Sequence, residues 1–90
     1  MKQITFGKYK NVIGKALAQI RTERGFSQSE LAAKMQVLGV NIDQQMISKI
    51  ERNQRQVTDY EFACFCLCLK VDTSELLKDF YTHLEKNGSR

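Results

Sequence analysis

Three cysteines are the residues whose type and spacing come nearest to a reactive or metal-binding site. Cys64, Cys66 and Cys68 fall within five residues of one expected helix, and Cys64 and Cys68 lie one helical turn apart. Such a pair could bind a metal ion or respond to oxidants. No histidine or acidic cluster completes a site, and an odd cluster on one helix does not form a secreted disulfide framework. We therefore interpret the cysteines as reduced, small core residues, and we expect no metal and no other cofactor.

Catalytic chemistry has few candidates in this sequence. His83 is the only histidine, and no serine, cysteine or pair of carboxylates near it in the chain suggests a catalytic arrangement. The sequence also contains no glycine-rich phosphate loop. We expect that the protein is not an enzyme and that His83 is a surface residue.

Positive charge is concentrated in the first two thirds of the chain. Residues 1–57 contain ten Lys/Arg and four Asp/Glu, a balance of +6, whereas residues 58–90 contain four and six, a balance of −2. An uneven distribution of this kind can turn one basic face toward a polyanion such as DNA, although charge alone does not establish binding.

The length and composition indicate one small domain. The chain has 90 residues, of which 42% are hydrophobic and 27% charged, which is ordinary for a globular protein. The longest nearly unbroken apolar run, residues 63–69, is too short to cross a bilayer, and the N-terminal residues do not show the apolar h-region of a signal peptide. We expect a cytoplasmic protein.

We divide the chain into three parts. Residues 1–10 form a basic N-terminal arm whose lysines Lys2, Lys8 and Lys10 could reach phosphates. Residues 11–86 form the folded domain, and residues 87–90 form a frayed tail.

Helical periodicity and capping signals predict two helices in the first part of the domain. The first runs from about Tyr9 to Arg24 and ends at Gly25, a residue type that commonly closes a helix. The second starts at a capping box formed by Ser27 and Glu30.

A connection broken by glycine, Val37 to Ile42, separates the second helix from the third. Asp43 is expected to cap the third helix, which runs from about Gln44 to Asn53. Its apolar residues Ile47 and Ile50 should face inward. The residues expected to face outward are Gln44, Gln45, Ser48, Lys49 and Arg52.

Two more helices complete an all-α, compact five-helix bundle. A second capping box at Thr58–Glu61 opens the fourth helix, which ends near Lys70 and is apolar on nearly every side, as a central helix should be. Asp72 to Glu75 caps the fifth helix. Its apolar residues are Leu76, Leu77, Phe80, Tyr81 and Leu84.

The residues from about Ile13 to Leu77 resemble the helix-turn-helix domain of the lambdoid phage repressor and Cro family, an XRE-like family. Four stretches carry the resemblance in the right order: IR at 20–21 with GFSQ at 25–28, ELA at 30–32, ISKIER at 47–52, and VDTSELL at 71–77. The resemblance implies that the second and third helices form the helix-turn-helix.

In that family the recognition helix presents its first residues to base edges in the major groove. The resemblance therefore assigns base reading to Gln44, Gln45 and Lys49. A glutamine amide pairs with adenine N6 and N7, and each such bidentate pair contributes about 1–3 kcal/mol of discrimination. The alternative is that Gln44 and Gln45 are ordinary exposed amides of a helix surface.

The resemblance also assigns residues to the DNA backbone and to the interior. Phosphate or sugar contacts fall to Gln28, Ser48, Arg52, Asn53 and Arg55. For Arg52, Asn53 and Arg55 the alternative is solvated loop charge. Arg21 and Glu51 correspond to an internal pair that joins the first helix to the third.

Two features depart from the family pattern. The stretch from Met35 to Asp43 is longer than the usual turn of about three or four residues, as in long-turn variants of the family. Lys70 stands where the family usually has glycine, so we expect a strained or differently closed turn there.

These features together predict a transcriptional regulator, a repressor, that binds a two-fold operator in double-stranded DNA as a homodimer. The fifth helix offers the candidate dimer face: Leu76, Phe80, Tyr81 and Leu84. The alternative is an antitoxin-like or accessory module that uses the same fold to hold a protein partner, and restriction-modification control is a third possibility of the same physical type.

Overall fold

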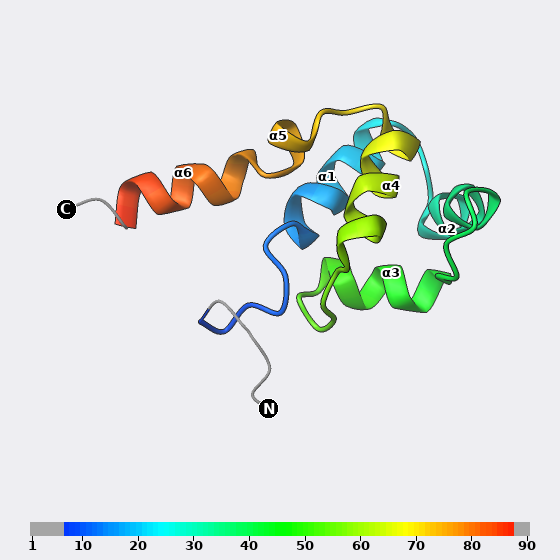
Figure 1. Cartoon of the computed structure of the whole chain (residues 1–90), viewed down its shortest axis with the longest axis horizontal. Coiled ribbons are helices and arrows are strands. Elements are labelled where there is room, and N and C mark those ends of the chain that lie inside the picture. Colours follow the sequence, from blue (N-terminus) through cyan, green and yellow to red (C-terminus); the bar gives the residue numbers. More distant parts are fainter. Residues whose placement is uncertain (1–6, 88–90) are drawn as a thin grey trace.

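A computed structural model describes residues 7–87, which form helices and connecting loops with no β-sheet in that range (Figure 1). The helices are α1 Gly14–Glu23, α2 Gln28–Val37, α3 Gln44–Glu51, α4 Asp59–Leu69, α5 Thr73–Leu76 and α6 Lys78–Asn87. None of them is long and apolar enough to cross a membrane. The predicted all-α class is confirmed, while the predictions for Lys2 and for residues 88–90 of the tail lie outside the described residues.

The single C-terminal helix expected after Asp72 is in fact two helices. Leu77, with φ −95° and ψ 1°, leaves the helical region between α5 and α6. Leu76 is fully buried, whereas α6 extends away from the other helices (Figure 1). The break at Leu77 thus separates a residue that must enter the core from a helix that leaves it. Asp72 precedes α5 but makes no side-chain capping bond, contrary to expectation.

The other three capping predictions are confirmed. Ser27 Oγ accepts a hydrogen bond from the Glu30 amide at 3.0 Å, and the Glu30 carboxylate accepts one from the Ser27 amide at 2.8 Å. Thr58 and Glu61 repeat this exchange at the start of α4. Asp43 accepts from the Met46 amide at 2.8 Å. Because each cap satisfies amides that a helix leaves unpaired, each stabilises its helix by about 1 kcal/mol.

The five helices from α1 through α5 share one hydrophobic core. Its fully buried large side chains are Leu17, Leu31, Met35, Ile42, Ile47, Ile50, Phe65, Leu69 and Leu76. The expectation that α4 is the central helix of the core needs correction. It packs on α2 and α5, but Tyr60 and Leu67 are 60% and 66% exposed, so one side of the helix faces solvent.

Asn11 decides where α1 begins. Its Oδ1 accepts hydrogen bonds from the amides of Ile13 and Gly14 at 3.0 and 2.7 Å, so it caps the helix. Its Nδ2 donates to the carbonyl oxygens of Ile50 and Arg55 at 3.0 and 2.9 Å. The helix therefore starts at Gly14 rather than near Tyr9, because Asn11 holds the preceding residues against the end of α3.

Gly14 allows the backbones of α1 and α3 to meet. It is buried, and a Cβ built on it would overlap the carbonyl oxygen of Ile50. That oxygen is also an acceptor for Asn11 Nδ2. The contact requires glycine because of the close approach, not because of an unusual backbone angle.

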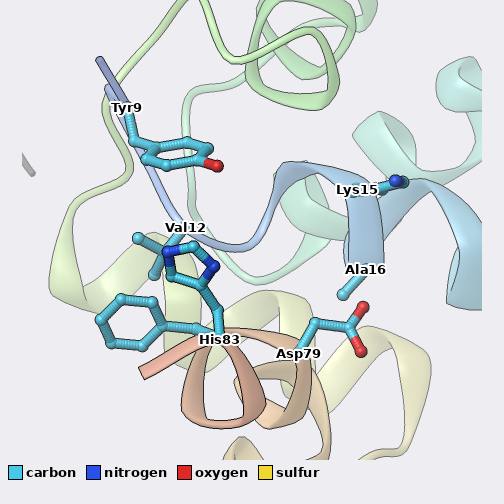
Figure 2. A pocket seen from close by; sticks show the side chains of 7 residues that line it. Tyr9, Val12, Lys15, Ala16, Asp79 and His83 are labelled. Atoms are coloured by element: carbon cyan, nitrogen blue, oxygen red, sulfur yellow. The ribbon is translucent and has the colours of Figure 1, made fainter. Parts of the chain in front are cut away.

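The residues before α1 also contact α6. The rings of Tyr9 and His83 pack edge to face with their centroids 6.5 Å apart, although both residues are exposed. A cavity of about 320 Å³ lies beside them, lined by Tyr9, Val12, Lys15, Ala16, Asp79, Phe80 and His83. Figure 2 shows the Tyr9 ring facing His83, with Asp79 and Ala16 farther along the cavity.

Lys70 ends α4 in the left-handed region, with φ 57° and ψ 49°. The expected strained turn is therefore confirmed. The Val71 amide donates to the Cys66 carbonyl oxygen at 3.1 Å, which closes the turn in the way that a glycine usually does.

Gly14→Ala should destabilise the protein by about 1–3 kcal/mol, since the added methyl group must push α1 away from the Ile50 carbonyl. Urea denaturation measures the free energy of unfolding. Lys15→Ala, an exposed neighbour on α1, is the control and should change it by less than about 0.5 kcal/mol. Helix propensity alone predicts the opposite sign for Gly14→Ala, so a more stable variant would refute the close contact.

Lys70→Gly should stabilise the protein by about 1 kcal/mol, because glycine adopts left-handed angles without the steric cost that Lys70 bears. The midpoint of thermal unfolding should rise by several degrees. Lys15→Gly places glycine at an exposed helical lysine instead and should lower the midpoint. If both variants lower it, the strain at Lys70 is not significant.

Candidate nucleic-acid interface

The residues predicted to read bases share the exposed side of α3. Ile47 and Ile50 are buried in the core, whereas Gln44, Gln45 and Lys49 are exposed. Ser48 lies beside them and is half-buried. The helix thus anchors itself by its apolar side and presents two amides and one ammonium group to solvent.

The connection formed by residues 38–43 brings the starts of α2 and α3 together. Gln44 Nε2 donates to Gln28 Oε1 at 2.6 Å, and these are the first residues of the two helices. Gln28 Nε2 in turn donates to Glu51 Oε1 at 2.8 Å. An amide predicted to read bases and an amide predicted to contact phosphate therefore belong to one hydrogen-bonded chain.

Glu51 also accepts from Arg21, which lies on α1. Arg21 Nε and Nη2 donate to the two carboxylate oxygens at 2.8 and 3.1 Å, and Nη1 donates to the Phe26 carbonyl oxygen at 2.7 Å. The Arg21 and Glu51 side chains are only 15% and 7% exposed. This pair is part of the interior, where losing one partner costs more than the pair contributes.

Two residues predicted to contact the DNA backbone follow α3 at its end. Arg52 is exposed, and its Nε donates to the Ser48 carbonyl oxygen at 3.3 Å. Asn53 has a left-handed backbone, with φ 62°. Its Oδ1 accepts from the amides of Lys10 and Asn11 at 2.8 and 3.2 Å, so it binds the segment before α1.

Arg55 is the predicted backbone contact whose surroundings differ most from expectation. Its Nη1 and Nη2 donate to the two carboxylate oxygens of Glu61 at 3.0 and 2.9 Å, and the side chains are 24% and 4% exposed. The guanidinium is therefore engaged within the chain rather than displayed as a solvated loop charge.

The same contacts shift the pKa values of both groups. Burial raises the pKa of the Glu61 carboxyl, but the hydrogen bonds from Arg55 and Thr58 and the Arg55 charge lower it by more, so the net shift is downward. The hydrogen bond to Glu61 raises the pKa of Arg55. Both groups are thus held in their charged forms.

A helix-turn-helix family model matches residues 17–76, which include α2, the connection and α3. No curated protein matches the sequence. The matched stretch is well over half of the chain. The chain belongs to the helix-turn-helix family.

Membership of the helix-turn-helix family identifies α2 and α3 as the two helices of the motif and makes the protein a DNA-binding regulatory domain. In such motifs the second helix enters the major groove and the first crosses the DNA backbone. The match also covers α4 and all of α5, which supply part of the remaining core.

Sequence reasoning missed two residues that shape this helix-turn-helix surface. The predicted first helix includes Asn11, and the predicted capping box accounts for only part of the role of Glu61. Glu61 is 3% exposed and completes the pair with Arg55. The sequence does contain a signal for Glu61. It lies six residues after Arg55, and its capping bond with Thr58 already fixes the position of its carboxylate. Asn11 gave none, because its partners are about forty residues away.

The candidate dimer face also needs one correction. Leu76 is fully buried in the core and is not available to a partner. Tyr81 is 49% exposed, and Phe80 and Leu84 are half-buried on α6. The remaining apolar surface lies on a helix that extends away from the helix-turn-helix.

Glu61→Gln should lower the free energy of unfolding by about 1.5–3 kcal/mol at neutral pH, because Arg55 loses hydrogen bonds to a charged partner. The pKa of Glu61 is lower in the folded state than in the unfolded state. Its contribution is therefore present above the unfolded pKa and is lost as pH falls through the folded pKa.

Denaturation of wild type and Glu61→Gln across the acid range measures this dependence. The difference between them should shrink as pH falls. Asp59→Asn, an exposed residue in the same helical turn, serves as the control and should show little difference at any pH. A gap between wild type and Glu61→Gln that does not change with pH would show that the carboxylate charge is unimportant.

Proposed function

We propose that this helix-turn-helix protein is a sequence-specific transcriptional repressor that reads the major groove with α3. The observation that carries the proposal is the junction of α2 and α3, where Gln44 and Gln28 bond to each other beside exposed Gln45 and Lys49. The junction presents hydrogen-bonding groups for bases and for phosphate on the same surface.

Gln44 and Gln45 supply the base readout in this proposal. The bond to Gln28 uses one of the two N–H donors of Gln44 and orients its amide. The carbonyl oxygen and the second N–H of that amide match adenine N6 and N7. An orientation set before binding lowers the entropy lost when the complex forms. Lys49, about one turn later, contacts a guanine or a phosphate.

The DNA backbone contacts come from residues around the two helices. Gln28, the first amides of α2 and Ser48 face one phosphate strand, and Arg52 adds charge at the other end of α3. Asn53 and Arg55, which already bond within the chain, hold the following loop in place beside the same strand.

We propose that the connection between α2 and α3 distinguishes this motif within its family. Residues 38–43 make it longer than the usual turn of about three or four residues. We propose a long-turn variant of the lambdoid repressor and Cro type. Gln36 Nε2 donates to the Ile42 carbonyl oxygen at 2.9 Å, which supports the longer connection.

A homodimer on a two-fold operator completes the proposal. Its contact surface is α6, with Phe80, Tyr81 and Leu84 as the apolar residues. Half-sites then lie about one helical turn, or a multiple of it, apart. The rival function, an antitoxin-like module for a protein partner, calls for a continuous apolar patch. Large exposed apolar residues instead come from separate elements: Tyr9 before α1, Val37 and Leu38 at the end of α2, Tyr60 and Leu67 on α4, and Tyr81 on α6.

Selection of binding sites from a random duplex pool tests this function. Wild type should enrich a two-fold site, and Gln44→Ala combined with Gln45→Ala should lose base preference at matching positions in each half-site. Each lost bidentate contact should reduce discrimination about 5- to 150-fold. Gln19→Ala, an exposed glutamine on α1, is the control and should select the same site as wild type.

Titration of salt separates charge from readout. Arg52→Ala should weaken binding to all sequences and reduce the salt dependence by about one phosphate contact, without a change in the selected site. Enrichment of only one half-site would refute the dimer. Binding that is weak, salt-sensitive and unselective would refute sequence-specific repression and favour the protein-partner alternative.

A further inference from the structure

The tertiary structure adds a third sulfur atom to the cysteine pair of α4. Cys68 Sγ lies 3.7 Å from Sδ of Met35, which belongs to α2 and is fully buried. Cys64 precedes Cys68 by one turn, and both thiols are half-buried and reduced. Residues at this spacing have Cβ atoms about 5–6 Å apart on one helix face, so both thiols can reach a single ion.

The Cys68 thiol lies in a partly buried environment close to the charge of Lys34. Burial, with the nearby Cys64, raises the pKa of the Cys68 thiol, while the Lys34 charge acts in the opposite direction. Lys34 lies over the Phe26 ring at 4.6 Å. Cys66 points to another side of α4, where it is 6% exposed beside Asp72.

Two thiols and one thioether make a soft donor set. Thiolate and thioether ligands favour Cu(I), whereas Zn²⁺ structural sites use four thiolate or imidazole ligands. Within residues 7–87 no three His, Cys, Asp or Glu side chains are placed to hold a metal, so a zinc site of that type has no basis there.

The separation of the two sulfurs also suits a small soft ion. For metal–sulfur bonds of about 2.3 Å, trigonal coordination places the sulfurs about 4 Å apart. The observed 3.7 Å between Cys68 and Met35 is within a few tenths of an ångström of that value. An ion can therefore join these two atoms with little movement of α2 relative to α4.

We propose that Cys64, Cys68 and Met35 form a binding site for one Cu(I) ion between α2 and α4. On binding, each cysteine forms a Cu–S bond and releases one proton, while Met35 donates a sulfur lone pair and loses nothing. The metal remains Cu(I), and no electron is transferred. Two thiolates and one Cu(I) leave a net charge of −1, which the Lys34 ammonium partly balances.

Competition against a chromophoric Cu(I) chelator tests the site, with the reduced, metal-free full chain under anaerobic conditions. Wild type should retain one Cu(I) per chain, and Cys64→Ser and Cys68→Ser should each yield it to the chelator. Met35→Leu keeps the core volume and should weaken affinity more than about tenfold, the lower limit even for changes in the second shell of a metal site. Cys66→Ala removes a thiol outside the site and should bind as wild type.

X-ray absorption and thermal unfolding test whether Cu(I) is bound by the proposed sulfur atoms. The wild-type complex should show three sulfur neighbours and Met35→Leu two, and Cu(I) should raise the unfolding midpoint of wild type but not of Cys68→Ser. Failure of wild type to retain the ion, loss of binding in Cys66→Ala, or unchanged affinity in Met35→Leu would each overturn the proposal. No outcome depends on DNA binding.

Discussion

The carboxylate of Glu51 is the point at which polar contacts join the first three helices. It accepts from Arg21 on α1 and from Gln28 on α2, and Gln28 in turn accepts from Gln44 at the start of α3. A charge that is 7% exposed requires such partners, because an unpaired buried carboxylate would be strongly destabilising. Because Gln28 is one of these partners and also bonds to Gln44, the partners of Glu51 connect α2 to α3. Stability of the interior and orientation of the candidate base-reading amide therefore depend on one group.

A second set of contacts holds the other end of α3. Asn11 donates hydrogen bonds to the Ile50 and Arg55 carbonyl oxygens, and Gly14 lets α1 approach α3 closely. The Asn53 side chain accepts a hydrogen bond from the Lys10 amide, in the segment before α1. These contacts leave little freedom for α3 to move relative to α1. A helix that must present side chains to a rigid groove with small positional error benefits from support at both ends.

The side of the molecule formed by α2 and α4 has a different character. Where these two helices pack together, Cys68 Sγ lies against Met35 Sδ at the hydrophobic core, whereas Glu51 bonds to Arg21 and to Gln28 at the start of α2. This division explains how one small domain can combine a polar junction at α2 and α3 with a soft donor set elsewhere. Both features use α2, whose first residue belongs to the junction and whose Met35 lies near its opposite end.

Local signals in the sequence determined where α2, α3 and α4 begin. Ser27, Asp43 and Thr58 cap their helices because a side chain and an amide three residues away need no tertiary context to meet. Apolar periodicity likewise identified Ile47 and Ile50 as the inner side of α3 and left Gln44, Gln45 and Lys49 outside. The Arg21–Glu51 pair came only through the family resemblance. Only the tertiary structure decided the start of α1, the break at Leu77 and the meeting of Cys68 with Met35. Each of these depends on which atoms distant segments bring together when the core closes, and neither residue type nor spacing specifies that.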